Sequence, residues 1–151
     1  MSEDALLLDD MLGKLGTYLR MCGYDAAYAM HRGVETDEEI IALAETEGRT
    51  LLTRDAELAA HAPDALLLHE HETVDQLAEL LEAGYELELD DDPTRCGACN
   101  APVTRVAPEE QTPDYAPEPD FEPIWRCREC GQHFWRGSHW DDVAETLSDL
   151  Q

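Results

Sequence analysis

Two short apolar runs in this chain each end near an aspartate, and these two acids are the first candidates for chemistry. Asp9 follows the run at 5–8, and Asp55 follows the run at 50–53 after one intervening residue. In a parallel sheet the carboxyl ends of the strands lie at one edge, where open α/β folds bind their ligands. If the two runs form neighbouring strands, their carboxylates face a single crevice.

A third acid, Asp37, begins the helix expected between these strands, and its N-terminus is expected at the same edge. Three adjacent carboxylates repel one another, and a divalent cation relieves that repulsion. Oxygen ligands with room for water suit Mg²⁺ or Mn²⁺, which can orient a water molecule for attack on a phosphodiester. We therefore predict a catalytic metal site formed by Asp9, Asp37 and Asp55. The alternative is that Asp37 and Asp55 only cap helices.

Few basic residues are available to hold a substrate near these acids. Lys14, Arg20 and Arg54 flank the predicted crevice, and Thr53 stands at the end of its strand. We predict that these four residues contact the substrate. For the lone lysine, the ordinary alternative is a solvated salt bridge on the surface.

Four of the five cysteines form two Cys-x-x-Cys pairs, Cys96/Cys99 and Cys127/Cys130, each followed by a residue that tolerates a tight turn. Two such pairs place four thiolates at the corners of a tetrahedron, the geometry of a closed structural zinc site. The segment has few large apolar residues, so the metal would supply its folding energy. We predict a zinc ribbon without catalytic function, and an iron–sulfur cluster or a redox pair is the alternative.

The elements needed to position these groups follow from the hydrophobic pattern. Short apolar runs alternate with amphipathic segments up to about residue 88, which predicts a parallel sheet covered by helices on both faces, a three-layer α/β/α sandwich. Thr36 and Glu39 form a capping box, and Gly48 ends that helix. The strands are expected at 5–8, 26–29, 50–53 and 65–68, and the helices at about 12–21, 36–47, 55–61 and 73–82.

The composition changes at the acidic stretch 86–93, so we predict an α/β domain over residues 1–90 and a zinc ribbon with a C-terminal helix over 91–151. Residues 108–123 are rich in proline and predict an extended loop between the cysteine pairs. Ser138 is a candidate cap for the last helix. The aromatic stretch "FWRGSHW" (134–140) either stacks on bases or packs the ribbon onto the first domain.

Charge is the extreme feature of the composition. The 151 residues include 35 Asp and Glu against 10 Lys and Arg, for a formal net charge of −25. Such self-repulsion destabilises a compact state in dilute buffer and is screened at molar salt. We therefore expect a protein adapted to high salt. The sequence contains no signal-peptide pattern and no apolar run of membrane-spanning length, so we expect a cytoplasmic protein without a membrane partner.

The stretches "LLLDDMLGKLGTYLRMCGYDAAY", "TDEEIIALAETEGRTLLTRDAEL" and "FWRGSHWDDV", together with the cysteine pairs between them, occur in an order that resembles the Mut-seven C-terminal RNase domain family. This resemblance implies a PIN-like nuclease fold joined to a zinc ribbon, and acidic site residues at Asp9, Asp37 and Asp55. It also marks Arg20 as a position in the family pattern. A fourth acid found in many PIN nucleases has four candidates here, which are Asp10, Glu38, Glu57 and Asp75.

Three functional hypotheses follow. The first is a Mg²⁺- or Mn²⁺-dependent ribonuclease that hydrolyses RNA phosphodiester bonds. The second is a non-catalytic RNA-binding or ribosome-associated module, in which the ribbon binds and the acids hold no metal. The third is the toxic half of a nuclease pair that is blocked by a protein partner, for which the sequence offers no positive sign.

Overall fold

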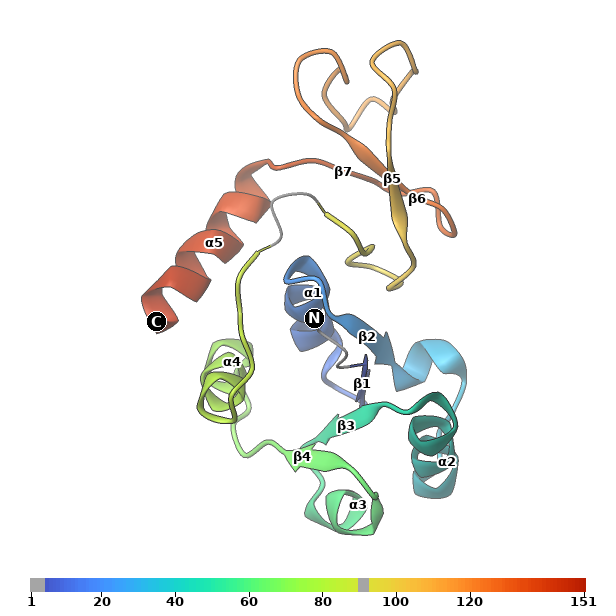
Figure 1. Ribbon diagram of the computed structural model, residues 1–151, viewed down its shortest axis with the longest axis vertical. Helices are drawn as coiled ribbons and strands as arrows, with labels where there is room; N and C mark the ends of the chain where they lie inside the picture. Colours follow the sequence, from blue (N-terminus) through green and yellow to red (C-terminus); the bar gives the residue numbers. More distant parts are fainter. Residues whose placement is uncertain (1–4, 90–92) are drawn as a thin grey trace.

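We describe the protein from a computed structural model that places residues 5–89 and 93–151 (Figure 1). The first half alternates strands and helices, as the hydrophobic pattern predicts. Its elements are β1 (Ala5–Leu8), α1 (Gly13–Met21), β2 (Asp25–Tyr28), the short 3₁₀ helix η1 (Ala29–Arg32), α2 (Asp37–Glu47), β3 (Thr50–Thr53), α3 (Ala56–His61), β4 (Ala65–Leu67) and α4 (Thr73–Glu82).

The four strands of this half form one parallel sheet in the order β2-β1-β3-β4. β1 and β3 are neighbours, with Leu8 paired to Leu52. This confirms the expectation that the strand preceding Asp9 lies beside the strand preceding Asp55.

Consecutive leucines of the central strands point to opposite faces of the sheet and so build two separate cores. Leu6, Leu8 and Leu52 belong to one core with the apolar side chains of α1 and α4. Leu7 and Leu51 belong to the other with those of α2 and α3. Helices therefore cover both faces, which confirms the three-layer α/β/α sandwich.

Most predicted boundaries agree with the structure to within one or two residues. The capping box of Thr36 and Glu39 is present, and Gly48 takes the left-handed conformation that ends α2. The prediction for Ser138 was wrong, because Ser138 is the first residue of the last helix and Gly137 is its N-cap, without a side-chain cap.

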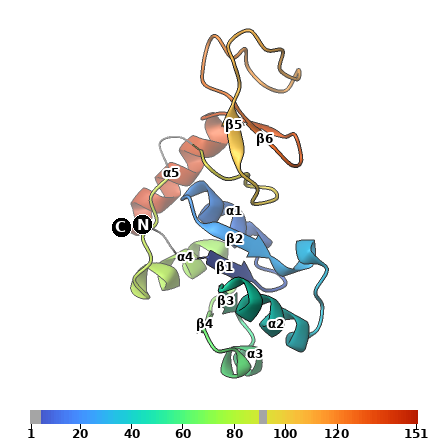
Figure 2. The ribbon, with the colours of Figure 1, turned by 45° about the vertical axis from the view of Figure 1, so that its right-hand side comes forward.

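The second half contains a small antiparallel sheet, β5 (Val103–Arg105), β6 (Trp125–Cys127) and β7 (His133–Phe134), followed by α5 (Ser138–Leu150). The loop between β5 and β6 contains turns and no helix or strand, as its prolines predict. We call this sheet, with its cysteine pairs, the ribbon. After β7 the chain enters α5, which runs back towards α4 (Figures 1 and 2). Val143 and Leu147 of α5 are buried in the core that contains β1, α1 and α4. The predicted division at 90/91 falls at residues 90–92, outside the described residues, and remains a prediction.

The ribbon is attached to the sheet at the backbone of Ala26, a residue of the edge strand β2. The Ala26 N–H donates to Asn100 Oδ1 (2.9 Å), and the Ala26 carbonyl accepts from Arg20 Nε (2.8 Å). Arg20 Nη1 also donates to the Gly97 carbonyl in the first cysteine pair (2.9 Å). Because an unpaired edge strand is open to pairing with other chains, these contacts, which we call the Ala26 junction, also protect the sheet.

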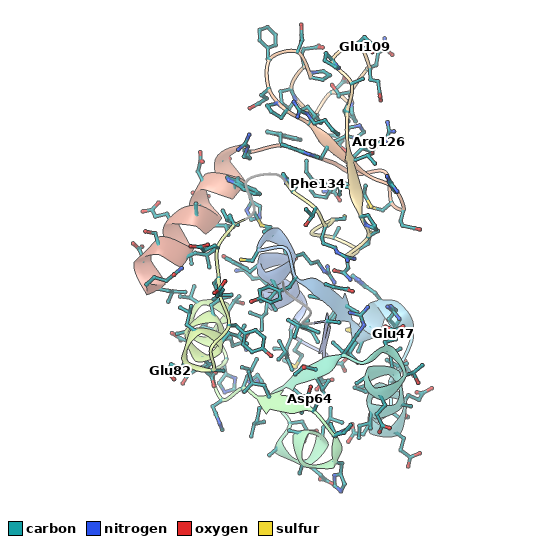
Figure 3. The ribbon with its side chains drawn as sticks, in the orientation of Figure 1. Glu47, Asp64, Glu82, Glu109, Arg126 and Phe134 are labelled. Atoms are coloured by element: carbon teal, nitrogen blue, oxygen red, sulfur yellow. The ribbon has the colours of Figure 1, made fainter. Side chains whose placement is uncertain are left out.

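A charged network surrounds the Ala26 junction at the start of β2. Asp25 accepts hydrogen bonds from Asn100 Nδ2 (2.6 Å) and Arg49 Nη1 (2.9 Å). Arg49 also contacts Glu47 (Figure 3), which Arg32 holds through two hydrogen bonds. Partial burial opposes the charged form of Asp25, but the hydrogen bonds from Asn100 and Arg49 outweigh it and lower the pKa of this carboxyl.

In the part of the chain that the structure describes, no helix is both long enough and apolar enough to cross a membrane.

Asn100 allows a direct test of the Ala26 junction, because its backbone is left-handed (φ 73°) and glycine tolerates that conformation. We expect Asn100→Gly to lower the free energy of unfolding by about 1–3 kcal/mol, since the Ala26 N–H then loses its partner. Asn100→Ala should cost about 1 kcal/mol more through backbone strain.

Urea denaturation measures both changes. Gly131 is the matched control, since it follows the second cysteine pair with a similar φ (77°) and a Cβ added there would meet nothing within 4 Å. Gly131→Asn should change stability by less than about 0.5 kcal/mol. An equal loss in the Gly131 and Asn100 variants would contradict the role of Asn100.

The lowered pKa of Asp25 predicts a pH-dependent contribution to stability. The ionised carboxylate stabilises the folded state above its unfolded pKa of about 4, and this contribution is lost as the pH falls towards the folded pKa. The stability gap between wild type and Asp25→Asn should therefore be constant from about pH 7 to pH 5 and shrink below about pH 4. Denaturation at each pH tests this, and a gap that does not change with pH would argue against it.

Candidate functional site: a carboxylate edge and a four-cysteine cluster

The four cysteine sulfurs converge in the ribbon. Their Sγ atoms all lie within 4.8 Å of one another, with 3.7 Å between Cys96 and Cys130 and 3.4 Å between Cys99 and Cys127. A tetrahedral site with Zn–S bonds of about 2.3 Å requires sulfurs about 3.8 Å apart. The cluster therefore has the ligand type and spacing of a structural zinc site.

The protein also supplies hydrogen bonds that favour thiolates. The N–H groups of Glu129 and Cys130 point at the sulfur of Cys127. Burial opposes ionisation of Cys127, but these backbone donors lower its pKa to about 7. Burial raises the pKa of Cys96 well above its usual range. Cys96 therefore needs a bound cation to ionise at neutral pH.

At the other candidate site, Asp9 is fixed by contacts with the neighbouring strand β3. Its backbone N–H donates to the Leu52 carbonyl (3.1 Å), and its Oδ2 accepts a hydrogen bond from Thr53 Oγ1 (2.7 Å). Thr53 is completely buried, so this contact fixes the carboxylate at the ends of two adjacent strands.

The chain leaves Asp9 through a strained turn. The N–H of Leu12 donates to the Asp9 carbonyl, which closes a four-residue turn, and Met11 in that turn has a φ of 71°. Left-handed backbone at a residue with a side chain costs about 1–2 kcal/mol, and such strain is concentrated at functional sites. Met11 is also 83% exposed beside the acid.

The other two predicted acids stand at helix starts. Asp55 shares Thr53 with Asp9, because the Asp55 N–H donates to Thr53 Oγ1 (3.0 Å). The Asp55 carboxylate caps α3 by accepting from the N–H groups of Glu57 and Leu58. Asp37 is exposed in the first turn of α2. The helix-cap alternative is thus realised for Asp55, while Thr36, not Asp37, caps α2.

The structure brings Asp9, Thr53 and the backbone of Asp55 together, but it does not gather all three carboxylates. Among residues 5–89 and 93–151, the four cysteines are the only group of three or more His, Cys, Asp or Glu side chains placed to hold one metal ion. Magnesium commonly binds one or two carboxylates together with water and substrate phosphate. The oxygen donors at this edge suit such a partial ligand set, and a site formed by three acids stays a prediction.

The predicted substrate contacts fall in different places. Lys14 is exposed in the first turn of α1, at the end of the helix that follows Asp9 in the chain. Arg54 donates to His71 (2.8 Å), and its Nε is buried with no hydrogen-bond partner among the described residues. Arg20 is only 3% exposed and binds the carbonyls of Ala26 and Gly97. The contacts of Arg20 are structural, and its contact with substrate stays a prediction.

Sequence reasoning missed His71 and Asn100. His71 follows β4 at the edge where Asp9 and Asp55 follow their strands, so the strand-end argument applied to "LLLHEHE" would have found it. Asn100 appeared only as a residue that tolerates a turn. Its side-chain role has no local signal, because its partner Ala26 is 74 residues away in the sequence.

The chain is a parallel α/β sandwich joined to a four-cysteine ribbon. An acid lies at the ends of the two central strands of the sandwich. Together these features define its class of fold and site. The family model for the Mut7-C RNAse domain matches residues 4–147. The chain therefore belongs to the Mut7-C RNAse domain family, which confirms the resemblance seen in the sequence and supports a hydrolase that acts on RNA. No curated protein and no solved structure matched the chain.

Removing zinc with a chelator should unfold the ribbon and release the Ala26 junction, while the sheet itself persists. Hydrogen exchange would then accelerate at the Ala26 amide, which Asn100 protects, but not at the Asp9 amide, which is bonded within the sheet. Zinc affinity should also fall as the pH is lowered, because four thiols must lose protons to bind. Unchanged exchange at Ala26 after zinc loss would show that the attachment does not depend on the metal.

Proposed function

We propose that this protein is a Mg²⁺- or Mn²⁺-dependent ribonuclease whose reaction takes place at the carboxyl ends of β1 and β3. Family membership supports the RNase class. The observation that carries the location is the 2.7 Å hydrogen bond between buried Thr53 and Asp9 across the two central strands. A carboxylate held this rigidly is suited to a catalytic role, since catalysis requires preorganised groups.

The roles of the chain's residues follow from their contacts. Thr53 uses its hydroxyl hydrogen for Asp9 and accepts from the Asp55 N–H, so it fixes the carboxylate of one residue and the backbone of the other. Asp9 Oδ1 accepts from the Asp10 N–H, which fixes the rotation of the carboxylate. A divalent cation held by Asp9, with Asp37 and Asp55 as further ligands, would polarise the phosphodiester and supply a water nucleophile.

Two basic groups are placed to hold the anionic substrate. Arg54 follows Thr53 directly, and its guanidinium, which also bonds His71, places a positive charge at this edge that can attract a phosphate. Lys14 lies in the first turn of α1, whose N-terminus carries no acidic residue in that turn. These positions favour phosphate binding beside Asp9 rather than elsewhere on a chain of net charge −25.

The second candidate is a non-catalytic RNA-binding module. It is favoured by the absence of a gathered three-carboxylate site among the described residues. The two proposals differ in whether Mn²⁺ binds saturably at Asp9. Paramagnetic broadening of signals near Asp9 on addition of Mn²⁺ supports the ribonuclease. Its absence supports the binding module.

The net charge supports a further proposal, that the protein works at high salt. Screening at molar salt reduces the self-repulsion of the 35 acidic residues. The assay of cleavage is therefore best performed in molar KCl.

Asp9→Asn should reduce RNA cleavage by about 100-fold or more, because the amide keeps the shape but loses the charge. Asp64→Asn is a matched control, since Asp64 (Figure 3) accepts a similar 2.8 Å hydrogen bond from Thr50. Thr50 is the first residue of β3, the strand whose last residue, Thr53, bonds Asp9. The cleavage rate of this control should match wild type. Cleavage of a labelled single-stranded RNA with Mg²⁺ measures both, and full activity in Asp9→Asn with normal zinc content would refute the assignment.

A further inference from the structure

A cavity of about 410 Å³ lies where the ribbon meets the last turns of α1. One wall is the segment from His133 to Trp140, and another is the first cysteine pair at Gly97 and Ala98. Phe134 (Figure 3) is the last residue of β7 and lines the cavity. The cavity has the size of small-ligand pockets, and five of its 15 lining residues carry aromatic rings. These rings belong to His133, Phe134, Trp135, His139 and Trp140.

The charge of this cavity is opposite to that of the chain. Although 35 of the 151 residues are acidic, the described residues that line the cavity include no Asp or Glu, whereas they include Arg20 and Arg95. An anionic ligand meets repulsion over most of this protein, so a concave surface whose described lining carries arginine and no carboxylate is a favourable place for it to bind.

The walls are preorganised. A side chain at Gly137 would place its Cβ 2.7 Å from Trp135 Nε1, so glycine allows the indole to lie against the backbone. The cavity therefore presents flat apolar faces, which suit a flat heterocycle better than an aliphatic group.

The cavity lies a short distance along α1 from the carboxylate edge, where Asp9 and Asp55 follow β1 and β3. α1 begins beside Asp9, and the cavity residues Thr17, Arg20 and Met21 lie four to eight residues beyond Gly13. At about 1.5 Å per residue, this is about 6–12 Å along the helix. A single-stranded RNA of a few nucleotides can span that distance.

We propose that this cavity binds one unstacked nucleobase of a single-stranded RNA, with the adjacent phosphate near Arg95. The inference rests on the proposed function for its ligand class and adds a second contact, remote from the acids. Stacking on aromatic side chains is tolerant of sequence and does not depend on salt as phosphate contacts do. It is therefore a suitable source of affinity for an acidic protein.

The test measures binding of a fluorescent oligoadenylate of eight nucleotides by anisotropy, without added divalent cation. An oligonucleotide of the same length with abasic sites is the second probe. Wild type should bind the base-containing strand at least about tenfold more tightly than the abasic strand. Trp140→Ala should lose about tenfold in affinity, and Trp140→Phe should restore most of it, because a smaller ring still stacks.

Phe121→Ala is the matched control, since Phe121 is an aromatic residue that is 85% exposed and outside the cavity. It should bind like wild type. If Trp140→Ala fails to fold, Ala98→Glu and Ala98→Gln provide a second pair, because Ala98 is exposed at the cavity wall. At the lowest salt at which the protein stays folded, the added carboxylate should weaken binding several-fold more than the amide.

The failures of the two proposals are distinguishable. Equal binding of both probes, or Trp140→Ala with normal zinc content and unchanged affinity, overturns the base-binding cavity even if RNA is cleaved. Base-dependent binding that Asp9→Asn retains supports the cavity whether or not wild type cleaves RNA. An apolar peptide that fills the cavity while the oligonucleotide does not bind would also overturn it.

Discussion

The arrangement of this protein depends on the backbone polar groups of one residue, Ala26 at the edge of the parallel sheet. Its N–H and carbonyl are paired by two side chains, Asn100 from the ribbon and Arg20 from α1. A buried unpaired peptide group costs free energy comparable to a lost hydrogen bond. The ribbon therefore supplies the partner of an edge N–H, while an arginine of the sandwich pairs the carbonyl, and the sandwich gives the ribbon a fixed surface.

The same contacts account for an arginine that is nearly completely buried. A zinc ion with four thiolates carries two net negative charges. Burial lowers the pKa of Arg20, and the nearby groups of Cys96, Cys99 and Asp25 act in the opposite direction. The guanidinium therefore has both carbonyl acceptors and neighbouring negative charge, the conditions under which a buried cation is tolerated.

The local sequence determined much of the fold. The leucine runs predicted the strands, because continuous apolar residues are typical of strands covered on both faces. The cysteine pairs predicted the metal cluster, since their spacing alone fixes the knuckle geometry. The contacts of Arg20 were not predictable in this way. Its position near the crevice predicted a substrate contact, but its partners lie in segments whose proximity depends on the tertiary fold.

The acidic site was predictable only in part. Adjacent strands bring Asp9 and Thr53 together, as the strand-end argument requires. The carboxylate of Asp55 is directed instead to the backbone of its own helix, because a helix N-cap competes for the same oxygen atoms. A strand-end aspartate that also begins a helix has two local uses, and the sequence does not distinguish them.

The position of α5 has a consequence for how the two halves respond to each other. The ribbon lies in the chain between α4 and α5, and both helices contribute to the same apolar core. The ribbon sheet is thus flanked in the chain by two helices that pack into one core. If it unfolds, the core keeps its last helix and only acquires a longer closed loop, at a free-energy cost that grows slowly with loop length. Metal availability can then change the surface beside α1 without dismantling the sheet that carries Asp9.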